Sequence, residues 1–178
     1  EVYNRISAEL LPTPARFHYT FNLRDISKVF QGVLMIRPKK CATADVMVRL
    51  WVHEAMRVFH DRLINKADQR WFQELTIELL SRQFRLSSTY DDLFVNGPPI
   101  MFGDWLKAGQ EVREYEETAD LGKMASVLDD YLDEYNVSNA NQMRLVFFDD
   151  AIKHISRVAR IIRQPRGNAM LVGVGGSG

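Results

Sequence analysis

The chain has 178 residues, enough for one large domain or two small ones. Hydrophobic residues make up 46%, so a buried core is expected, and 23 basic residues balance 23 acidic ones, so no net charge attracts the chain to nucleic acid or to a membrane surface. The single cysteine, Cys41, excludes an internal disulfide and fits a reducing, intracellular compartment. No apolar run reaches the roughly 18 residues of a membrane span.

The first half of the chain is predicted to be helical. A short helix ends before Pro12, and a second begins after the cap residue Asn22 and runs from residue 23 to about 36. The strongest helical pattern covers residues 43–66, where Met47, Leu50, Trp51 and other apolar residues recur at three- and four-residue steps. A further helix is expected over residues 68–84.

The second half alternates between irregular and helical stretches. Residues 86–118 contain an N-G-P-P sequence and several glycines, and they predict a long loop with one short strand at 99–102. A helix is predicted over 120–136, with Tyr135 on its apolar stripe, and another over 147–163, with Phe148 and Ile162 facing inward. The apolar run A-M-L-V-G-V at 169–174 predicts a buried strand. We therefore expect a mainly α fold: a helical bundle, then the start of an α/β nucleotide-binding domain.

The chain ends in a glycine motif. Its last six residues match the first six positions of the phosphate-binding loop G-x-x-x-x-G-K-[ST], in the order Gly173, Val174, Gly175, Gly176, Ser177 and Gly178. Such a loop needs glycines because successive backbone N–H groups must turn toward the phosphate oxygens. A flexible glycine-serine end is the alternative, but the apolar run directly before the motif favours a phosphate loop. The first residue is not methionine, so both ends are expected to be cuts in a longer protein.

Other charged residues point to structure rather than to chemistry. His53 and Glu54 would need a second histidine four residues after His53 to form a zinc site, but position 57 is arginine, so no metal site is predicted. Ion pairs are expected among Glu54, Arg57, Asp61 and Arg62.

The acidic and basic residues of the last predicted helix are also given structural roles. Asp149 and Asp150 fit the first turn of a helix, where negative charge complements the helix dipole. The basic stripe of Lys153, Arg157, Arg160 and Arg163 could contact phosphates, but a solvated or interdomain face is favoured. Near the second helix, Arg24 is by itself a surface arginine or a partner of Asp25 or of a neighbouring helix.

Three sequence blocks resemble the dynein heavy chain family, in the order in which they occur in its motor ring of six AAA+ modules. The blocks are LPTPARFHYTFNLRDISKVFQG, LWVHEAMRVFHDRL and LVFFDDAIKHISRVARIIRQPRGNAMLVGVGGSG. The residues of these blocks resemble axonemal members more than cytoplasmic members. The resemblance implies that residues 1–140 end the third module with its helical small domain, the lid, and that residues 141–178 begin the fourth module and stop within its Walker A loop.

The same resemblance assigns roles to individual residues. Arg24 takes the sensor-2 position, from which a lid arginine reaches the γ-phosphate bound to its own module. Leu145, Val146, Phe147 and Phe148 would lie near the adenine of the next nucleotide, and Gly173–Gly178 would begin the Walker A loop around its phosphates. The Walker lysine, the Walker B acids, sensor 1 and the arginine finger are not in this sequence. We therefore expect no hydrolysis, and no tight binding of nucleotide, by this chain alone.

For the full-length protein the resemblance implies ATP or ADP with Mg²⁺ as cofactors. It also implies neighbouring AAA+ modules, other dynein subunits and the microtubule as partners, and the cytoskeleton of a cilium or flagellum as the location. Neither nucleic acid nor membrane insertion is expected. The competing hypothesis is a non-catalytic helical interaction domain with an incidental glycine-rich tail.

Overall fold

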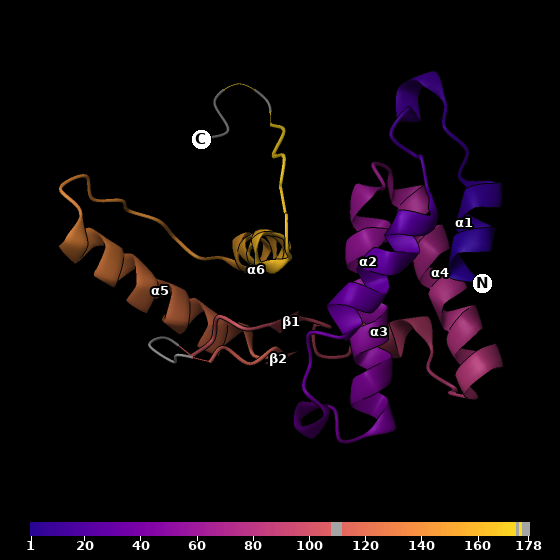
Figure 1. Ribbon diagram of the computed structural model, residues 1–178, viewed down its shortest axis with the longest axis horizontal. Coiled ribbons are helices and arrows are strands. Elements are labelled where there is room, and N and C mark those ends of the chain that lie inside the picture. Colours follow the sequence, from indigo (N-terminus) through magenta and orange to yellow (C-terminus); the bar gives the residue numbers. More distant parts are fainter. Residues whose placement is uncertain (108–111, 174, 176–178) are drawn as a thin grey trace. The chain divides into compact units, whose positions relative to one another are not determined.

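The computed structural model describes residues 1–107, 112–173 and 175. The described chain is mainly helical, as predicted (Figure 1). Its α-helices are α1 (Val2–Glu9), α2 (Leu23–Val33), α3 (Ala44–Val58), α4 (Lys66–Phe84), α5 (Leu121–Ser138) and α6 (Asp149–Arg163). Shorter elements are η1 (Pro14–Arg16), η2 (Pro38–Lys40), η3 (His60–Arg62), the π-helical turn η4 (Asp91–Val95), β1 (Phe102–Gly103) and β2 (Glu116–Glu117).

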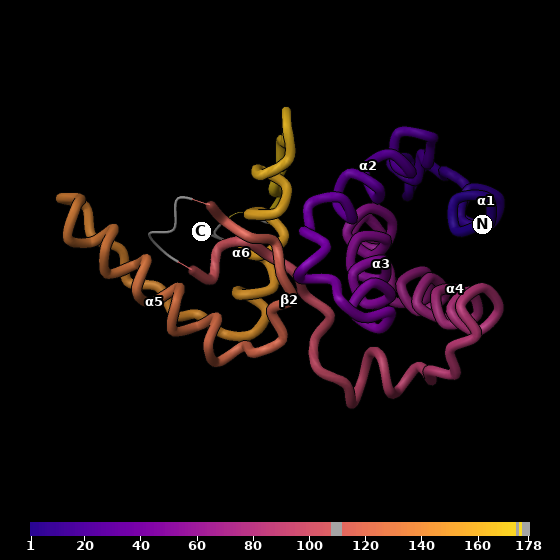
Figure 2. Tube along the Cα trace, turned by 60° about the horizontal axis from the view of Figure 1, so that its bottom comes forward, coloured from indigo at the N-terminus to yellow at the C-terminus, as the bar shows by residue number. Residues whose placement is uncertain are grey.

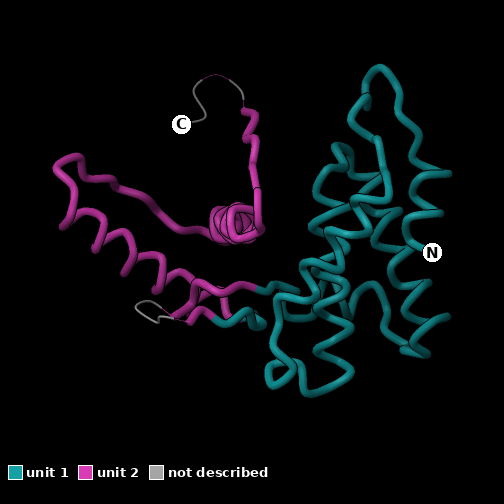
Figure 3. Tube along the Cα trace, viewed as in Figure 1, with its two compact units in different colours: residues 1–102, 114–119 teal, residues 103–113, 120–178 magenta. Residues whose placement is uncertain are grey.

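The chain divides into two compact units, shown in different colours in Figure 3. The first unit contains residues 1–102 and 114–119, and the second contains residues 103–113 and 120–178. The backbone therefore passes from one unit to the other three times, after residues 102, 113 and 119.

Side-chain caps set the starts of the helices in the first unit. Asn22 accepts a hydrogen bond from the Arg24 N–H at 2.8 Å, and Asp25 accepts one from the Asn22 N–H at 2.9 Å, which completes a capping box for α2. The Thr43 side chain accepts the Val46 N–H at the start of α3, and the Asn65 side chain accepts the Asp68 N–H at the start of α4. The cap predicted at Asn22 is confirmed, although α2 ends at Val33, before the predicted end.

Helix α3 is the centre of the first unit. Its residues Leu50, Val52 and Ala55 are almost fully buried, and Figure 2 shows α3 lying between α2 and α4. Val52 packs with Leu80 of α4, and Ala55 belongs to the cluster that also contains Ile6, Val29 and Phe72. Met47 belongs to the same apolar pattern, but 43% of it is exposed.

The single helix predicted over residues 43–66 is wrong in its second half. Helix α3 ends at Val58, a short 3-10 turn follows at His60–Arg62, and Asn65 caps the next helix. The chain turns here because Asn65 satisfies the N–H groups that begin α4, a role in which asparagine is favoured over the helix interior. The turn also buries Phe59 and Leu63.

The connector between α1 and α2 is held by one carboxylate. Tyr19 is 1% exposed, and its hydroxyl donates to Asp68 of α4 at 2.9 Å. Arg16 donates to the same Asp68 oxygen at 2.8 Å, and Asn65 donates to it at 2.6 Å. The Tyr19 hydroxyl in turn accepts the Ile64 N–H at 3.0 Å. The connector between α1 and α2 therefore has a fixed path.

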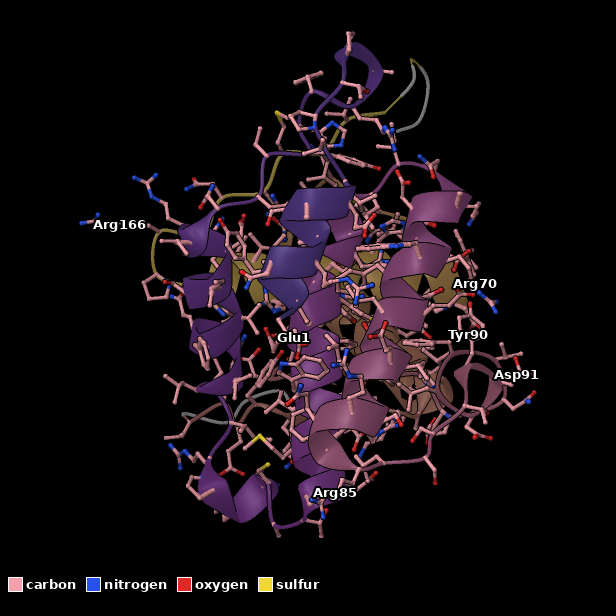
Figure 4. All side chains as sticks on the ribbon, turned by 90° about the vertical axis from the view of Figure 1, so that its right-hand side faces the viewer. Glu1, Arg70, Arg85, Tyr90, Asp91 and Arg166 are labelled. Atoms are coloured by element: carbon pink, nitrogen blue, oxygen red, sulfur yellow. The ribbon has the colours of Figure 1, made fainter. Side chains whose placement is uncertain are left out.

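The stretch after α4 is more ordered than the predicted loop. Arg85 ends α4 in the left-handed conformation, at φ 57°. A π-helical turn follows at Asp91–Val95, just after Tyr90, whose ring lies under the Arg70 guanidinium, 3.4 Å from its centre (Figure 4). The short strand predicted at 99–102 is displaced to β1, which pairs with β2. Leu86, Leu93 and Phe94 of this stretch pack against the cluster that contains Val52 and Leu80.

In the second unit, α5 and α6 contact each other and bury Met124, Leu128 and Ile152. Two polar contacts support them: Arg163 pairs with the buried Asp104, and the Tyr131 hydroxyl donates to the Trp105 carbonyl at 2.9 Å. Part of the predicted inward stripe is wrong, because Tyr135, Phe148 and Ile162 are exposed. A single neighbouring helix covers only a narrow stripe of α6. Of the predicted basic stripe, Arg163 is exposed but Arg160 is buried, so the solvated alternative is wrong at Arg160.

The turn after α6 depends on Gly167. Arg166 adopts a left-handed conformation at φ 59°, and the Gly167 N–H donates to the Gln164 carbonyl at 2.8 Å. A Cβ at position 167 would lie 1.8 Å from the Ile161 carbonyl oxygen, which is backbone and cannot swing away. The end of α6 predicted from Pro165 and Gly167 is confirmed.

The first prediction concerns the Asp68 carboxylate. Burial alone would raise its pKa, but hydrogen bonds from Arg16, Tyr19 and Asn65 outweigh burial and hold the pKa below its usual range. Because the folded-state pKa is depressed, the stabilisation is present above the unfolded pKa of about 4 and is lost as the pH falls through the folded value.

Asp68→Asn should therefore lower the free energy of unfolding by about 1.5–3 kcal/mol at pH 7. In urea unfolding measured from pH 7 down to pH 3, the difference in free energy of unfolding between the wild type and Asp68→Asn should become smaller below about pH 4. Asp129→Asn, at an exposed position of α5, is the control and should change little. A gap that stays constant across this range would contradict the assignment.

The second prediction concerns the turn at Gly167. Gly167→Ala should destabilise the last turn of α6 by about 1–3 kcal/mol, because the added Cβ forces the backbone to move. Amide exchange at Gln164 and Gly167 reports the change, since both N–H groups are hydrogen-bonded in the wild type. Gly175→Ala is the matched control, because nothing lies within 4 Å of a Cβ placed there. Equal exchange in the two variants would refute the steric argument.

Candidate nucleotide-binding residues

Arg24 is exposed in the first turn of α2. It does not pair with Asp25, because the Asp25 carboxylate is taken by Arg62 at 2.8 Å and by the Asn22 N–H at 2.9 Å. Among the described residues the Arg24 guanidinium makes no ion pair. The capping box thus holds the backbone of Arg24 in place while its side chain is left available to a ligand from outside the chain.

The outer face of α2 beside Arg24 is apolar. Leu23, Phe30 and Leu34 are 69%, 63% and 80% exposed, and they follow one another at helical spacing along the same face. A groove of about 570 Å³ adjoins this face and is lined mainly by apolar residues of α1–α4, among them Val2, Ile26, Phe30, Met47, Trp51 and Phe84. The groove can accept apolar side chains, but its lining offers no cluster of donors for phosphate.

The residues expected near adenine form an extended segment before α6. Leu145, Val146 and Phe148 are exposed and Phe147 is half-buried. Asn136 anchors the start of this segment, since its side chain donates to the Met143 carbonyl at 2.9 Å and accepts the Met143 N–H at 2.8 Å. The segment thus begins at a fixed point of α5 and presents apolar side chains, as an adenine-binding stretch would.

The predicted strand at 169–174 is wrong for the described residues. Residues 168–173 are neither helical nor paired in a sheet, and Met170, Leu171 and Val172 are 88%, 76% and 83% exposed. A buried parallel strand requires neighbours on both sides, and the sheet in the described residues is the short β1–β2 pair. Gly173 is exposed and Gly175 is in open space. Val174, Gly176, Ser177 and Gly178 lie outside the described residues.

The ion pairs predicted for α3 and η3 are confirmed in part. Arg57 pairs with Asp61 at 3.0 Å, as the spacing predicts, and Arg62 pairs with Asp25 of α2. Glu54 instead accepts a hydrogen bond from the Tyr115 hydroxyl at 2.7 Å. Asp149 and Asp150 lie in the first turn of α6, as predicted. Within the described ranges, no group of three or more His, Cys, Asp or Glu side chains is placed to hold a metal ion.

Sequence reasoning missed the role of residues 114–119. These residues return to the first unit and contact η2 and α3 through ion pairs, although they were predicted to belong to a loop. The available signal was opposite charge: the basic run R-P-K-K at 37–40 and the acidic run E-Y-E-E at 114–117. No helix of the described residues is long and apolar enough to span a membrane.

Two family models match the chain. Residues 1–94 match the AAA+ lid domain, and residues 143–178 match the P-loop containing dynein motor region D4. Among curated proteins, dynein axonemal heavy chain 6 of Homo sapiens is 49% identical over 180 residues, which is 100% of this chain and 4% of that protein. Dynein axonemal heavy chain 1 of Mus musculus is 48% identical over 177 residues, which is 99% of this chain and 4% of that protein.

The match to dynein axonemal heavy chain 6 covers the whole chain, including residues 95–142, which neither family model covers. The chain spans about 4% of the length of these relatives. The AAA+ lid match covers the described helices α1–α4, which form one compact unit with its own core. The chain therefore belongs to the AAA+ lid domain family, in the form found in dynein heavy chains.

Proposed function

We propose that this chain is part of the ATP-driven ring of a microtubule motor. In this proposal residues 1–140 complete one AAA+ module, the third, with its lid, and residues 141–178 begin the next. The observation that carries the proposal is the order of the two family matches, a lid followed by the P-loop region D4 within one chain. That order is expected where one module of a ring ends and another begins.

In this proposal Arg24 is the lid residue that contacts the phosphates of the nucleotide. Its guanidinium is exposed and makes no ion pair among the described residues, and the capping box fixes its position at the start of α2. A guanidinium can form bidentate, charge-assisted hydrogen bonds with phosphate oxygens. The exposed apolar face of Leu23, Phe30 and Leu34 would dock against the large domain that holds that nucleotide.

The second nucleotide site would begin in the second unit. Leu145, Val146, Phe147 and Phe148 present apolar side chains suited to adenine, and the Gly173–Gly178 motif supplies the first part of the phosphate loop. The exposed run Met170–Val172 would become a strand once neighbouring strands of the same module cover it. This need for cover disfavours the alternative of a self-sufficient interaction domain with an incidental tail, as does the D4 match.

The motor activity, its cofactors and its partners belong to the whole heavy chain in this proposal. ATP or ADP with Mg²⁺ would occupy the two sites, and the partners would be the neighbouring modules, other dynein subunits and the microtubule. The axonemal names of the relatives support a ciliary or flagellar location. When nucleotide binds or leaves, the lid would rotate as a rigid body, since a close-packed core does not deform continuously.

The third prediction tests Arg24 in the full-length heavy chain. Arg24→Ala should weaken ATP binding at the site of its own module roughly 10-fold or more, because a hydrogen bond to a charged phosphate is lost. Nucleotide affinity measured by fluorescence titration gives the readout. Lys28→Ala removes another exposed cation from the same helix and is the control. If the two variants bind ATP equally, Arg24 does not read the nucleotide.

The fourth prediction tests the glycine motif. A chain extended through the rest of the following module should bind Mg-ATP in titration calorimetry, and Gly176→Val should abolish that binding because a side chain blocks the approach of phosphate to the backbone. Gly122→Val, on the exposed surface of α5, is the control and should bind normally. Normal binding by Gly176→Val would exclude the motif from the site.

A further inference from the structure

Residues 114–119 have an unusual place in the chain, and we call them the strap. The backbone leaves the first unit after residue 102, returns for these six residues only, and leaves again after Ala119. The strap is thus covalently joined to the second unit at both of its ends while it packs within the first. The interactions that hold the strap therefore fix, within the first unit, a segment that is joined at both ends to the second unit.

One face of the strap is held by a buried hydrogen bond. Tyr115 is 3% exposed, and its hydroxyl donates at 2.7 Å to the carboxylate of Glu54 in α3, which is fully buried. The Tyr115 ring packs 6.1 Å from the ring of Phe102, and both belong to a cluster with Ile36 and Leu50. Tyr115 also forms a parallel β-bridge with Ile36. This face joins the strap to the core of the lid.

The other face of the strap is held by ion pairs. Alternate residues of an extended segment point to opposite sides, so Glu114 and Glu116 share a side that Tyr115 does not. Glu114 lies 2.5 Å from Lys39, and Lys40 lies 3.5 Å from Glu114 and 2.5 Å from Glu116. Arg37 adds a longer contact to Glu114, at 3.6 Å. The basic turn η2 therefore forms ion pairs with two carboxylates.

The ionisation of these groups agrees with an attractive clamp. The hydrogen bond to Glu116 raises the pKa of Lys40, and the hydrogen bond from Lys39 lowers the pKa of Glu114. Farther along, Arg49 of α3 pairs with Glu117 at 2.5 Å. Beyond the ion pairs, the Thr118 N–H donates to the Met101 carbonyl at 2.8 Å. The strap is thus attached at several successive residues.

We propose that the strap is a releasable fastener, locked to the lid by the Tyr115–Glu54 hydrogen bond and by the ion pairs to η2 and Arg49. It can release without unfolding the lid, because the helices α1–α4 keep the separate apolar clusters around Val52 and Ala55. The consequence for the motor rests on the proposed function: a fastened strap would transmit lid rotation to the second unit, and a released one would not.

The fifth prediction tests the fastening directly on the 178-residue chain, without nucleotide. The reporter is the Thr118 amide, whose hydrogen bond to Met101 breaks when the strap leaves. Tyr115→Phe removes the hydroxyl and keeps the ring, so hydrogen exchange at Thr118 should accelerate roughly 10-fold or more. The amides of α3 should exchange at the wild-type rate.

Tyr131→Phe is the matched control, because its hydroxyl donates to the Trp105 carbonyl within the second unit. It should leave Thr118 exchange unchanged. The proposal is overturned if Thr118 exchange is unaltered in Tyr115→Phe, since the strap would then be held without the lock. It is overturned equally if Thr118 and the α3 amides accelerate together, since the strap would then be an inseparable part of the lid.

A second arm tests the ionic lock and remains informative if Tyr115→Phe does not fold. Glu116→Gln removes a charge but no core atom, and it should accelerate Thr118 exchange several-fold, as should raising the salt concentration from 0.1 to 1 M for the wild type. Thr118 exchange that ignores both changes would refute the ionic clamp. Because neither arm involves nucleotide, failure here would leave the proposed ATP sites untouched, and failure of those sites would leave the fastener untouched.

Discussion

The burial of α3 is the constraint on which the first unit depends. This helix packs on apolar neighbours on several sides, and it also carries a fully buried carboxylate, Glu54. A buried polar group costs free energy unless it is hydrogen-bonded, and Tyr115 supplies a donor to Glu54 from a segment far away in the sequence. This hydrogen bond links the path of the strap to α3, while the other apolar clusters of the bundle do not include the strap.

The structure contains both segments with a fixed path and apolar surfaces that remain exposed. The connector before α2 is fixed on Asp68, so the capping box that presents Arg24 is built on a defined base. In contrast, the outer face of α2 and the segments around residues 145–148 and 170–172 leave large apolar side chains exposed. Exposed apolar groups of this size are typical of surfaces that other domains cover. The pattern agrees with the proposed function, which rests on the order of the two family matches.

Local signals in the sequence were sufficient for the helices. The cap at Asn22, the three- and four-residue steps of α3 and the stop at Pro165 and Gly167 all act within a few residues, and the structure follows them. The break after Val58 was missed because the apolar period continues through it into the buried Phe59 and Leu63. A periodic pattern reports which residues are buried, not whether the backbone remains helical between them.

Features that depend on distant partners could not be predicted. The run at 169–174 has the composition of a buried strand, but a strand forms only where neighbours supply its hydrogen bonds. Tyr115 and Glu54 are 61 positions apart, so no spacing rule connects them. Of the candidate site, the sequence left open whether Arg24 is a surface arginine or pairs with Asp25 or with a neighbouring helix. Arg24 does not pair with Asp25 because Arg62 does, and the sequence did not predict the Arg62–Asp25 ion pair.

A structure of the full-length heavy chain bound to a non-hydrolysable ATP analogue would test the central claim most directly. The account predicts that the Arg24 guanidinium lies within hydrogen-bond distance of the phosphates held by its own module. It also predicts that the backbone of Gly173–Gly178 encloses the phosphates of the following site. An Arg24 side chain left in solvent, with no phosphate at the glycine motif while both sites are occupied, would contradict it.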